Sequence, residues 1–221
     1  MKMEIDGQVA EKFQGIAVLE ISIGALSTGA TNPAFEEFKK QIYDEIQAEY
    51  AIETVKDAPI FRAYRDFFWK IGIDPTKTRP AAEALIRRIL QGKELPRINT
   101  VVDAYNLASV KSHISIAAFD TSELKGNLRL RFARSGERFT GIGTSQPIAL
   151  EGNELVIEDM GTGGAAEPIA VYPYRDSDGT KINESTKQAV FIMCGAPGIP
   201  LEPLEKAKAL VEEYVGKFCK K

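Results

Sequence analysis

Apolar and polar positions along the chain predict helices before residue 112 and strands after it. Residues 15–23 form a run rich in Val, Leu and Ile, which predicts a buried strand. From Asn32 and Pro33, which suit the cap and first turn of a helix, apolar side chains recur every three or four residues. They are Phe35, Phe38, Ile42, Ile46 and Tyr50. This spacing predicts an amphipathic helix.

Three more helices are predicted from the same periodicity, at about 59–71, 80–91 and 203–218. The first two are each followed by a glycine, which is a common helix end. The apolar stripe of the 59–71 helix is mostly aromatic. It consists of Phe61, Tyr64, Phe67, Phe68 and Ile71. We interpret this stripe as core packing, because large aromatic side chains are usually buried.

Short apolar runs alternate with turn residues in the second half of the chain. The runs are 114–119, 128–134, 139–143, 154–158, 168–174 and 189–194. Turn pairs such as Gly-Asn, Ser-Gly and Asp-Gly separate them, which predicts mainly antiparallel strands. The predicted fold class is therefore α+β, with N-terminal helices packed on a mainly antiparallel, strand-rich C-terminal half. No strong linker divides the sequence, so we expect residues 1–221 to form a single domain.

Composition narrows the class of protein. A chain that is 44% hydrophobic and 27% charged is neither disordered nor fibrous. The two cysteines are far apart and belong to no Cys/His cluster, so we expect no metal and no cofactor. Neither a signal peptide nor an apolar run near the ~20 residues of a membrane span is seen, so we expect a cytoplasmic protein without a membrane partner.

Two stretches are basic although the net charge is −3. Residues 79–97 hold five basic and two acidic side chains, and residues 125–138 hold five and one. In the second stretch, Arg129 and Arg131 share one face of a strand, and Arg134 follows. Arginine forks suit phosphate oxygens, so these three arginines are candidates for an RNA backbone contact. A solvated sheet face paired with nearby acids is an equally good interpretation.

Two familiar catalytic motifs are not supported. Gly161-Thr162-Gly163-Gly164 lacks the lysine and the following helix of a phosphate-binding loop. His113 is the only histidine and has no nucleophile elbow, so a structural role is favoured over Ser/His/Asp catalysis.

The most informative stretch is 96–106, Pro-Arg-Ile-Asn-Thr-Val-Val-Asp-Ala-Tyr-Asn. Spacings of four and three place Asn99, Asp103 and Asn106 on one helical face. Such a face either holds a neighbouring loop or grips a polar ligand. Residue types alone favour the structural role, because buried polar groups must find partners.

This stretch, together with Ile-Ser-Ile-Ala-Ala-Phe-Asp at 114–120, resembles the editing (B3/B4) domain of the phenylalanyl-tRNA synthetase beta chain. That family typically reads Ile-Asn-x-Val-Val-Asp-x-x-Asn, followed by His-Ala-Phe-Asp. Residues 175–186 resemble the Ser-x-Val-Thr-Glu-x-Thr segment of the same family. The resemblance covers roughly 60–196 without the other domains of the synthetase, so we expect a freestanding relative.

The resemblance implies hydrolysis, in trans, of the ester that joins a wrong amino acid to the 3′ adenosine of a tRNA. This reaction needs a positioned water and hydrogen bonds to the developing oxyanion, and no nucleophilic side chain. The implied partner is misacylated tRNA and not DNA. The residues expected to shape or face the pocket are Asn99, Asp103, Asn106, Ala117, Arg175, Asp178, Thr180 and Lys181.

One departure from the family pattern leaves the activity open. Ala117 stands where the family has the histidine of His-Ala-Phe-Asp. A catalytically inactive module that binds tRNA or an amino acid is therefore the alternative, and an unrelated small-molecule hydrolase is a third possibility. Either Asp176 or Asp178 is suited to hold a substrate ammonium, although an Asp-x-Asp-Gly turn also has structural reasons for its acids.

Overall fold

A three-stranded antiparallel sheet lies at the centre of the molecule in the computed structural model, which describes residues 2–29, 31, 33–162 and 166–220. Its order is β2 (Val18–Gly24), β10 (Gln188–Cys194) and β3 (Ser115–Asp120). The middle strand, β10, comes last in the sequence and pairs along its length with β2 and with β3. β3 is therefore an edge strand of this sheet.

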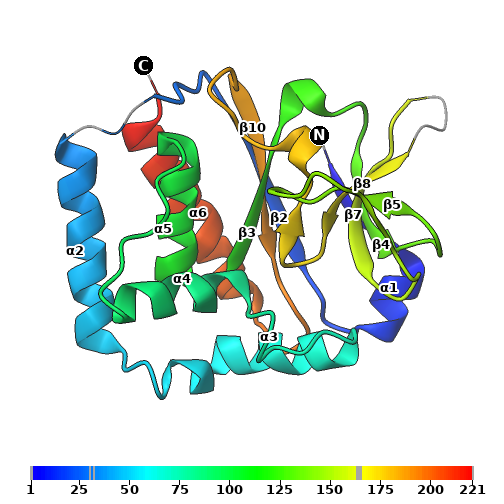
Figure 1. Cartoon of the computed structure of the whole chain (residues 1–221), viewed down its shortest axis with the longest axis horizontal. Helices are drawn as coiled ribbons and strands as arrows, with labels where there is room; N and C mark the ends of the chain where they lie inside the picture. Colours follow the sequence, from blue (N-terminus) through cyan, green and yellow to red (C-terminus); the bar gives the residue numbers. More distant parts are fainter. Residues whose placement is uncertain (1, 30, 32, 163–165, 221) are drawn as a thin grey trace.

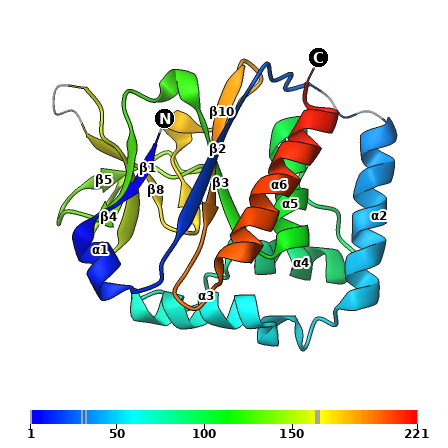
Figure 2. The ribbon, with the colours of Figure 1, turned by 180° about the vertical axis from the view of Figure 1, so that it is seen from behind.

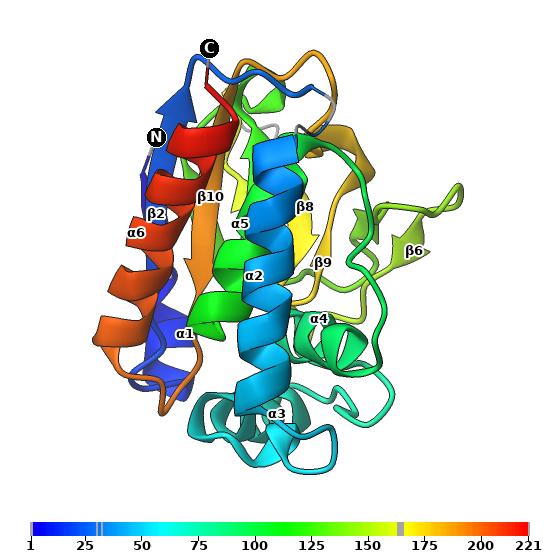
Figure 3. The same cartoon turned by 90° about the vertical axis from the view of Figure 1, so that its left-hand side faces the viewer.

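Helices cover one side of this sheet, as Figures 1 and 2 show from opposite directions. They are α2 (Pro33–Glu49), α4 (Ala81–Leu90), α5 (Thr100–Ser112) and α6 (Leu201–Phe218). α5 packs against α6, α4 and β3 and is buried along most of its length. α2 forms the outermost layer, in front of α5 in Figure 3. The polar groups of α5 must therefore find partners inside the protein.

A second sheet lies on the other side, away from the helices (Figure 1). Its strands, in order, are β1 (Met3–Ile5), β4 (Leu128–Phe132), β7 (Leu155–Asp159), β8 (Glu167–Val171) and β9 (Arg175–Asp176). All neighbours are antiparallel except β1, which runs parallel to β4. Smaller elements complete this half. They are α1 (Gly7–Lys12), the β5 (Arg138–Phe139) and β6 (Ile148–Ala149) pair, and the 3₁₀ turns η2 (Thr121–Glu123) and η3 (Asp178–Thr180).

Helix α3 (Pro59–Lys70), preceded by the turn η1 (Val55–Asp57), runs along one end of the molecule, below both sheets in Figure 1. Its predicted aromatic stripe is buried, which confirms the core interpretation. The hydroxyl of Tyr64 donates to the carbonyl of Cys194 and accepts a hydrogen bond from the N–H of Ser115 at 3.1 Å. α3 is thereby attached to the end of β10 and the start of β3.

The predicted α+β class is confirmed, and the long periodic elements lie close to their predicted bounds. β1 and α1 were not predicted, because three strand residues and a six-residue helix carry too little periodicity. The proposed cap Asn32 and the glycines Gly163 and Gly164 lie outside the described residues.

Candidate functional site

Asp103 on α5 is directed toward α2. Its Oδ2 lies 2.6 Å from Nζ of Lys39, and its Oδ1 accepts a hydrogen bond from the N–H of Ile98 at 3.2 Å. The two charged side chains are only 7% and 8% exposed. Burial opposes the charge of Lys39, but hydrogen bonds to Asp103 and Glu36 outweigh burial and raise its pKa. Asp103 therefore holds α2 and the loop before α5 in place.

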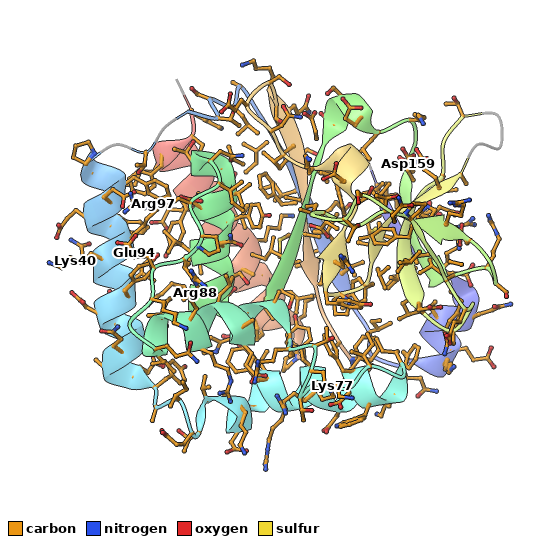
Figure 4. All side chains as sticks on the ribbon, in the orientation of Figure 1. Lys40, Lys77, Arg88, Glu94, Arg97 and Asp159 are labelled. Carbon is orange, nitrogen blue, oxygen red and sulfur yellow. The ribbon has the colours of Figure 1, made fainter. Side chains whose placement is uncertain are left out.

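Asn99 has a local role at the start of α5. Its Oδ1 accepts the N–H of Val102 at 3.0 Å, which caps the helix. Asn99 and Asp103 also border a small cavity of about 150 Å³, together with Arg97. Arg97 and Glu94 lie on the loop that connects α4 to α5, and Figure 4 shows this loop next to α2. Asn106 is half-buried one turn beyond Asp103. For Asn99 and Asp103, hydrogen bonds within the protein account for the polar face.

The other two segments of the family resemblance do meet. The hydroxyl of Thr186 donates to Oδ2 of Asp120 at 2.6 Å, which links 175–186 to the end of β3. Further along β3, the backbone N–H of Ala118 donates to the carboxyl of Asp176 on β9. Because β3 is an edge strand, alternate N–H groups point away from β10 and toward β9. The edge of β3 and the 175–186 segment thus form one site.

Asp176 is the most perturbed acid of this site. It is half-buried, and burial raises its pKa to about 7, against the opposing effect of the Ala118 N–H. Among the described residues no lysine or arginine forms an ion pair with it. A carboxyl that titrates near neutral pH beside a strand edge is typical of functional sites.

Tyr105 brings α5 to the same site. Its ring packs edge-on against Phe191 of β10, with centroids 5.9 Å apart. Burial raises the pKa of Tyr105 well above its usual value, and the charges of Asp176 and Asp103 raise it further. The phenol therefore stays protonated at neutral pH and is available as a hydrogen-bond donor.

The remaining predicted residues of the second segment are not all on the side of Asp176. Arg175 precedes it on β9, and neighbouring strand residues point to opposite faces. The Arg175 side chain lies across Gly141, where an added Cβ would stand 2.8 Å from its Cδ. Asp178 pairs with Lys181 at 2.6 Å near the surface. Arg175 has no acidic partner in the part of the chain that the structure describes.

Thr180 lies in η3, which contacts η2 at the end of β3. Its side chain is buried, and its Oγ1 has no hydrogen-bond partner among the described residues. A buried hydroxyl without a partner is unusual in a folded protein. The Thr180 hydroxyl therefore has a hydrogen-bonding capacity that no described group uses.

Ala117 and His113 show how this site differs from the family pattern. Ala117 is buried opposite Ile192 of β10, so no imidazole stands at that position. His113 ends α5 with a left-handed backbone (φ 63°) and packs on the rings of Tyr50 and Phe61. Burial lowers the pKa of His113, which favours the neutral ring. Its role is to end α5 and fill the adjacent core.

The three arginines proposed for RNA contact form an ion network on β4 and after it. Nε of Arg131 lies 2.6 Å from Glu158, and its NH2 lies 2.6 Å from Glu137. Arg129 reaches the same fully buried Glu158 at 2.7 Å. The exposed fractions of the Arg129, Arg131 and Arg134 side chains are 32%, 7% and 62%. Arg129 and Arg131 are therefore paired with acidic side chains, as in the alternative interpretation of these arginines as a paired sheet face. Arg134 is the most accessible of the three.

The sequence pattern gives no separate signal for Tyr105 and does not distinguish Asp176 from Asp178. The available signal for Tyr105 was its place inside the 96–106 block. For Asp176 the deciding property is burial against β3, which nothing near it in the sequence reveals.

The family model of the B3/4 domain matches residues 63–202, more than half of the chain. The chain belongs to the B3/4 domain family. The match includes α5, β3, β9 and β10, and hence Tyr105, Asp176 and Ala118 of this B3/4 protein. No curated protein matches it.

Among solved structures, this B3/4 protein is similar to an N-terminal fragment of the phenylalanyl-tRNA synthetase beta-subunit from Pyrococcus horikoshii. The TM-score is 0.52 and the sequence identity is 11%. The alignment covers 99% of this chain and 49% of the synthetase fragment, so the B3/4 protein spans about half of that fragment. At this identity the similarity shows a shared fold.

Within the described residues no helix is long and apolar enough to span a bilayer. In the same ranges no three His, Cys, Asp or Glu side chains are grouped as metal ligands would be.

Proposed function

We propose that this protein is an editing hydrolase that cleaves, in trans, the ester of misacylated aminoacyl-tRNA. The observation that carries the proposal is Asp176, a half-buried carboxyl with a pKa of about 7 at the edge of β3. A group with this pKa accepts a proton from water efficiently at neutral pH. The B3/4 family and the synthetase-like fold support a tRNA ester as substrate.

The proposed reaction uses three groups of the site. Ionised Asp176 takes a proton from a water molecule, whose oxygen attacks the ester carbonyl carbon. The protonated phenol of Tyr105 donates to the oxyanion that forms, and Thr180 Oγ1 bonds the substrate. The intermediate collapses, the 3′ oxygen of the ribose leaves and takes the proton, and the products are an amino acid and uncharged tRNA. An aminoacyl ester is already activated, so positioning supplies much of the rate increase.

The other predicted residues are proposed to serve the nucleotides next to the ester. Arg175 has no acidic partner among the described residues and its guanidinium suits a phosphate of the tRNA end. Arg134 is exposed enough to contact a more distant phosphate. Asp178 and Lys181 border the site as a surface pair.

A binding module without catalysis is the second candidate, and Ala117 favours it. The side chain at this buried position is a methyl group, so it neither transfers a proton nor orients water. A module of this kind retains aminoacyl-tRNA without cleaving it.

Release of free amino acid from a panel of misacylated tRNAs tests the proposal. The wild type is compared with Asp176→Asn and with Asp44→Asn, a matched change on the exposed face of α2. Release above the spontaneous rate by the wild type and by Asp44→Asn, but not by Asp176→Asn, supports the hydrolase. Retention without release by the wild type supports the module. Turnover of simple esters without any need for RNA indicates a small-molecule hydrolase instead.

A further inference from the structure

The outer face of α3 carries an exposed aromatic ring among charged side chains. Trp69 is the single tryptophan of the chain, and it is 58% exposed. Arg62, Arg65 and Asp66 precede it by seven, four and three residues, so they lie on the same face of the helix. The opposite face of α3 holds the buried aromatic stripe. Nothing in the packing of the core therefore requires tryptophan at this position.

Beside Trp69 the surface is hollowed, with a cavity of about 270 Å³. Its lining consists of Lys56, Asp57, Arg62, Arg65, Asp66 and Trp69. We name these residues, together with the adjacent Lys70, the α3 patch. The patch holds four basic and two acidic side chains, in a protein whose net charge is −3. Its charge thus has the opposite sign to that of the whole molecule, which suits a polyanion.

The cations of the patch are largely accessible. The ion pair of Arg62 with Asp57 is 3.8 Å long and more than half exposed on both sides, so it holds Arg62 only weakly. Lys56 and Lys70 are exposed as well. Arg65 is the exception, because it also pairs with the buried Glu83 at 3.1 Å. Arg62, Lys56 and Lys70 are therefore the groups free to meet a ligand.

We propose that the α3 patch binds single-stranded RNA, with a base stacked on Trp69 and phosphates held by Arg62, Lys56 and Lys70. An aromatic ring flanked by cations is the arrangement with which proteins hold single strands without reading their sequence. A protein partner fits less well, because Trp69 is the only large apolar side chain lining the hollow. This inference rests on the proposed function, since it gives the tRNA a contact away from the ester site.

α3 itself relates the patch to the ester site. On its inner face Tyr64 bonds Cys194 of β10 and Ser115 at the start of β3. The patch therefore lies on the outer side of the helix that supports the strand whose edge faces Asp176. RNA bound at the patch would therefore be held on the helix that supports β3, the strand of the proposed ester site.

Binding of uncharged RNA tests the patch without any chemistry. The probes are uncharged tRNA and a fluorescein-labelled single-stranded RNA of about ten nucleotides, within the usual site size. Trp69 reports directly, because a stacked base quenches its fluorescence and no other tryptophan contributes. We expect quenching by both probes, and binding that weakens steeply with salt.

Variants separate stacking from charge. Anisotropy of the labelled RNA should show roughly 5- to 150-fold weaker binding for Trp69→Ala, the range measured for one stacked base, and most of the affinity retained in Trp69→Phe. Arg62→Glu should weaken binding and reduce the salt slope by about 1 or more. Lys40→Glu makes the same change in net charge on α2, which Figure 4 shows away from α3, and it should have a smaller effect.

Three results would overturn the patch. They are wild-type affinity in folded Trp69→Ala, equal losses in Arg62→Glu and Lys40→Glu, and a concentration-dependent dimer that Trp69→Ala abolishes. Amino acid release is scored separately. If Trp69→Ala loses RNA affinity while the wild type releases no amino acid, the patch stands and the hydrolase fails. If the wild type releases amino acid and Trp69→Ala binds RNA with wild-type affinity, the proposed hydrolase activity is supported and the RNA-binding role of the α3 patch is rejected.

Discussion

Asp103 on α5 and Asp176 on β9 differ in the charged groups that lie beside them. On the α2 side, Asp103 is paired with the ammonium of Lys39 at 2.6 Å and with a backbone N–H. On the β9 side, Asp176 has a backbone N–H and the phenol of Tyr105 nearby, but no cationic partner among the described residues.

This difference separates a structural acid from the acid that we propose to be reactive. A buried carboxylate that is paired with its own cation holds neighbouring elements together, and removal of the cation leaves an uncompensated charge. Burial of a carboxyl without a cation raises its pKa toward neutral pH. Such a group can exchange protons with a substrate or water at physiological pH. The region that the sequence pattern emphasised is the structural one, and the region that it left ambiguous is the candidate for chemistry.

Lys39→Met should cause the largest loss of stability, because Lys39 is the cationic partner of Asp103. It leaves Asp103 as a buried charge without a partner, which costs about 3–5 kcal/mol of the free energy of unfolding. Urea denaturation measures the loss. The double variant Lys39→Met/Asp103→Leu removes both charges and should recover most of the stability. A loss below about 1 kcal/mol in Lys39→Met would mean that Asp103 is not held as described.

Asp176→Asn should have the largest effect on activity. Loss of the proposed general base lowers the rate of amino acid release by roughly 100-fold or more. Asp178→Asn should lower it by no more than about 3-fold, since Asp178 already pairs with Lys181 near the surface. Initial rates on the best misacylated tRNA decide between the two acids. A larger loss in Asp178→Asn would move the reactive role to η3.

The same Asp176→Asn change should affect stability in a pH-dependent way. The pKa of Asp176 is raised from 3.8 to about 7 in the fold, so the folded protein favours the protonated acid. That contribution is complete below about pH 4 and is lost as the pH rises through 7. The asparagine variant lacks this loss, so it should be more stable than the wild type by about 1–2 kcal/mol at pH 8, with partial solvent screening taken into account. Thermal unfolding at pH 4 and pH 8 measures the difference, and an equal gain at both values contradicts it.

Arg134→Gln should produce the smallest change in stability among these variants. It extends the comparison of buried and accessible charged groups from the acids to the arginines. Arg134 is 62% exposed, so its removal should alter the free energy of unfolding by less than about 0.5 kcal/mol. Its effect on RNA binding should be confined to a reduction of the salt slope by about 1. Binding of labelled tRNA at several salt concentrations checks this. A stability loss of several kcal/mol would mean that the exposed ion pairs of Arg134 with Glu137 and Glu158 contribute as much as the buried pairs of Arg131.

The sequence predicted well those features that depend on neighbours along the chain. The stripe of α3 and the strand β10 follow from local periodicity, because one face of each must be buried. The partner of Asp103 was not predictable, since Lys39 lies 64 residues away in the sequence. Asp176 and Asp178 look equivalent in the sequence, and only the packing of β9 against β3 makes one of them unusual.

The position of β10 has a consequence for how the protein is made. It pairs with β2, near the start of the chain, and with β3, near its middle, so that Cys194 stands opposite both Val18 and Ser115. During synthesis β2 and β3 remain without their central partner until β10, which follows both in the sequence, has been made. Closing such distant contacts is slow, and unpaired strands are exposed to aggregation in the meantime. We therefore expect the nascent chain, until β10 emerges, to be the form that most needs chaperones.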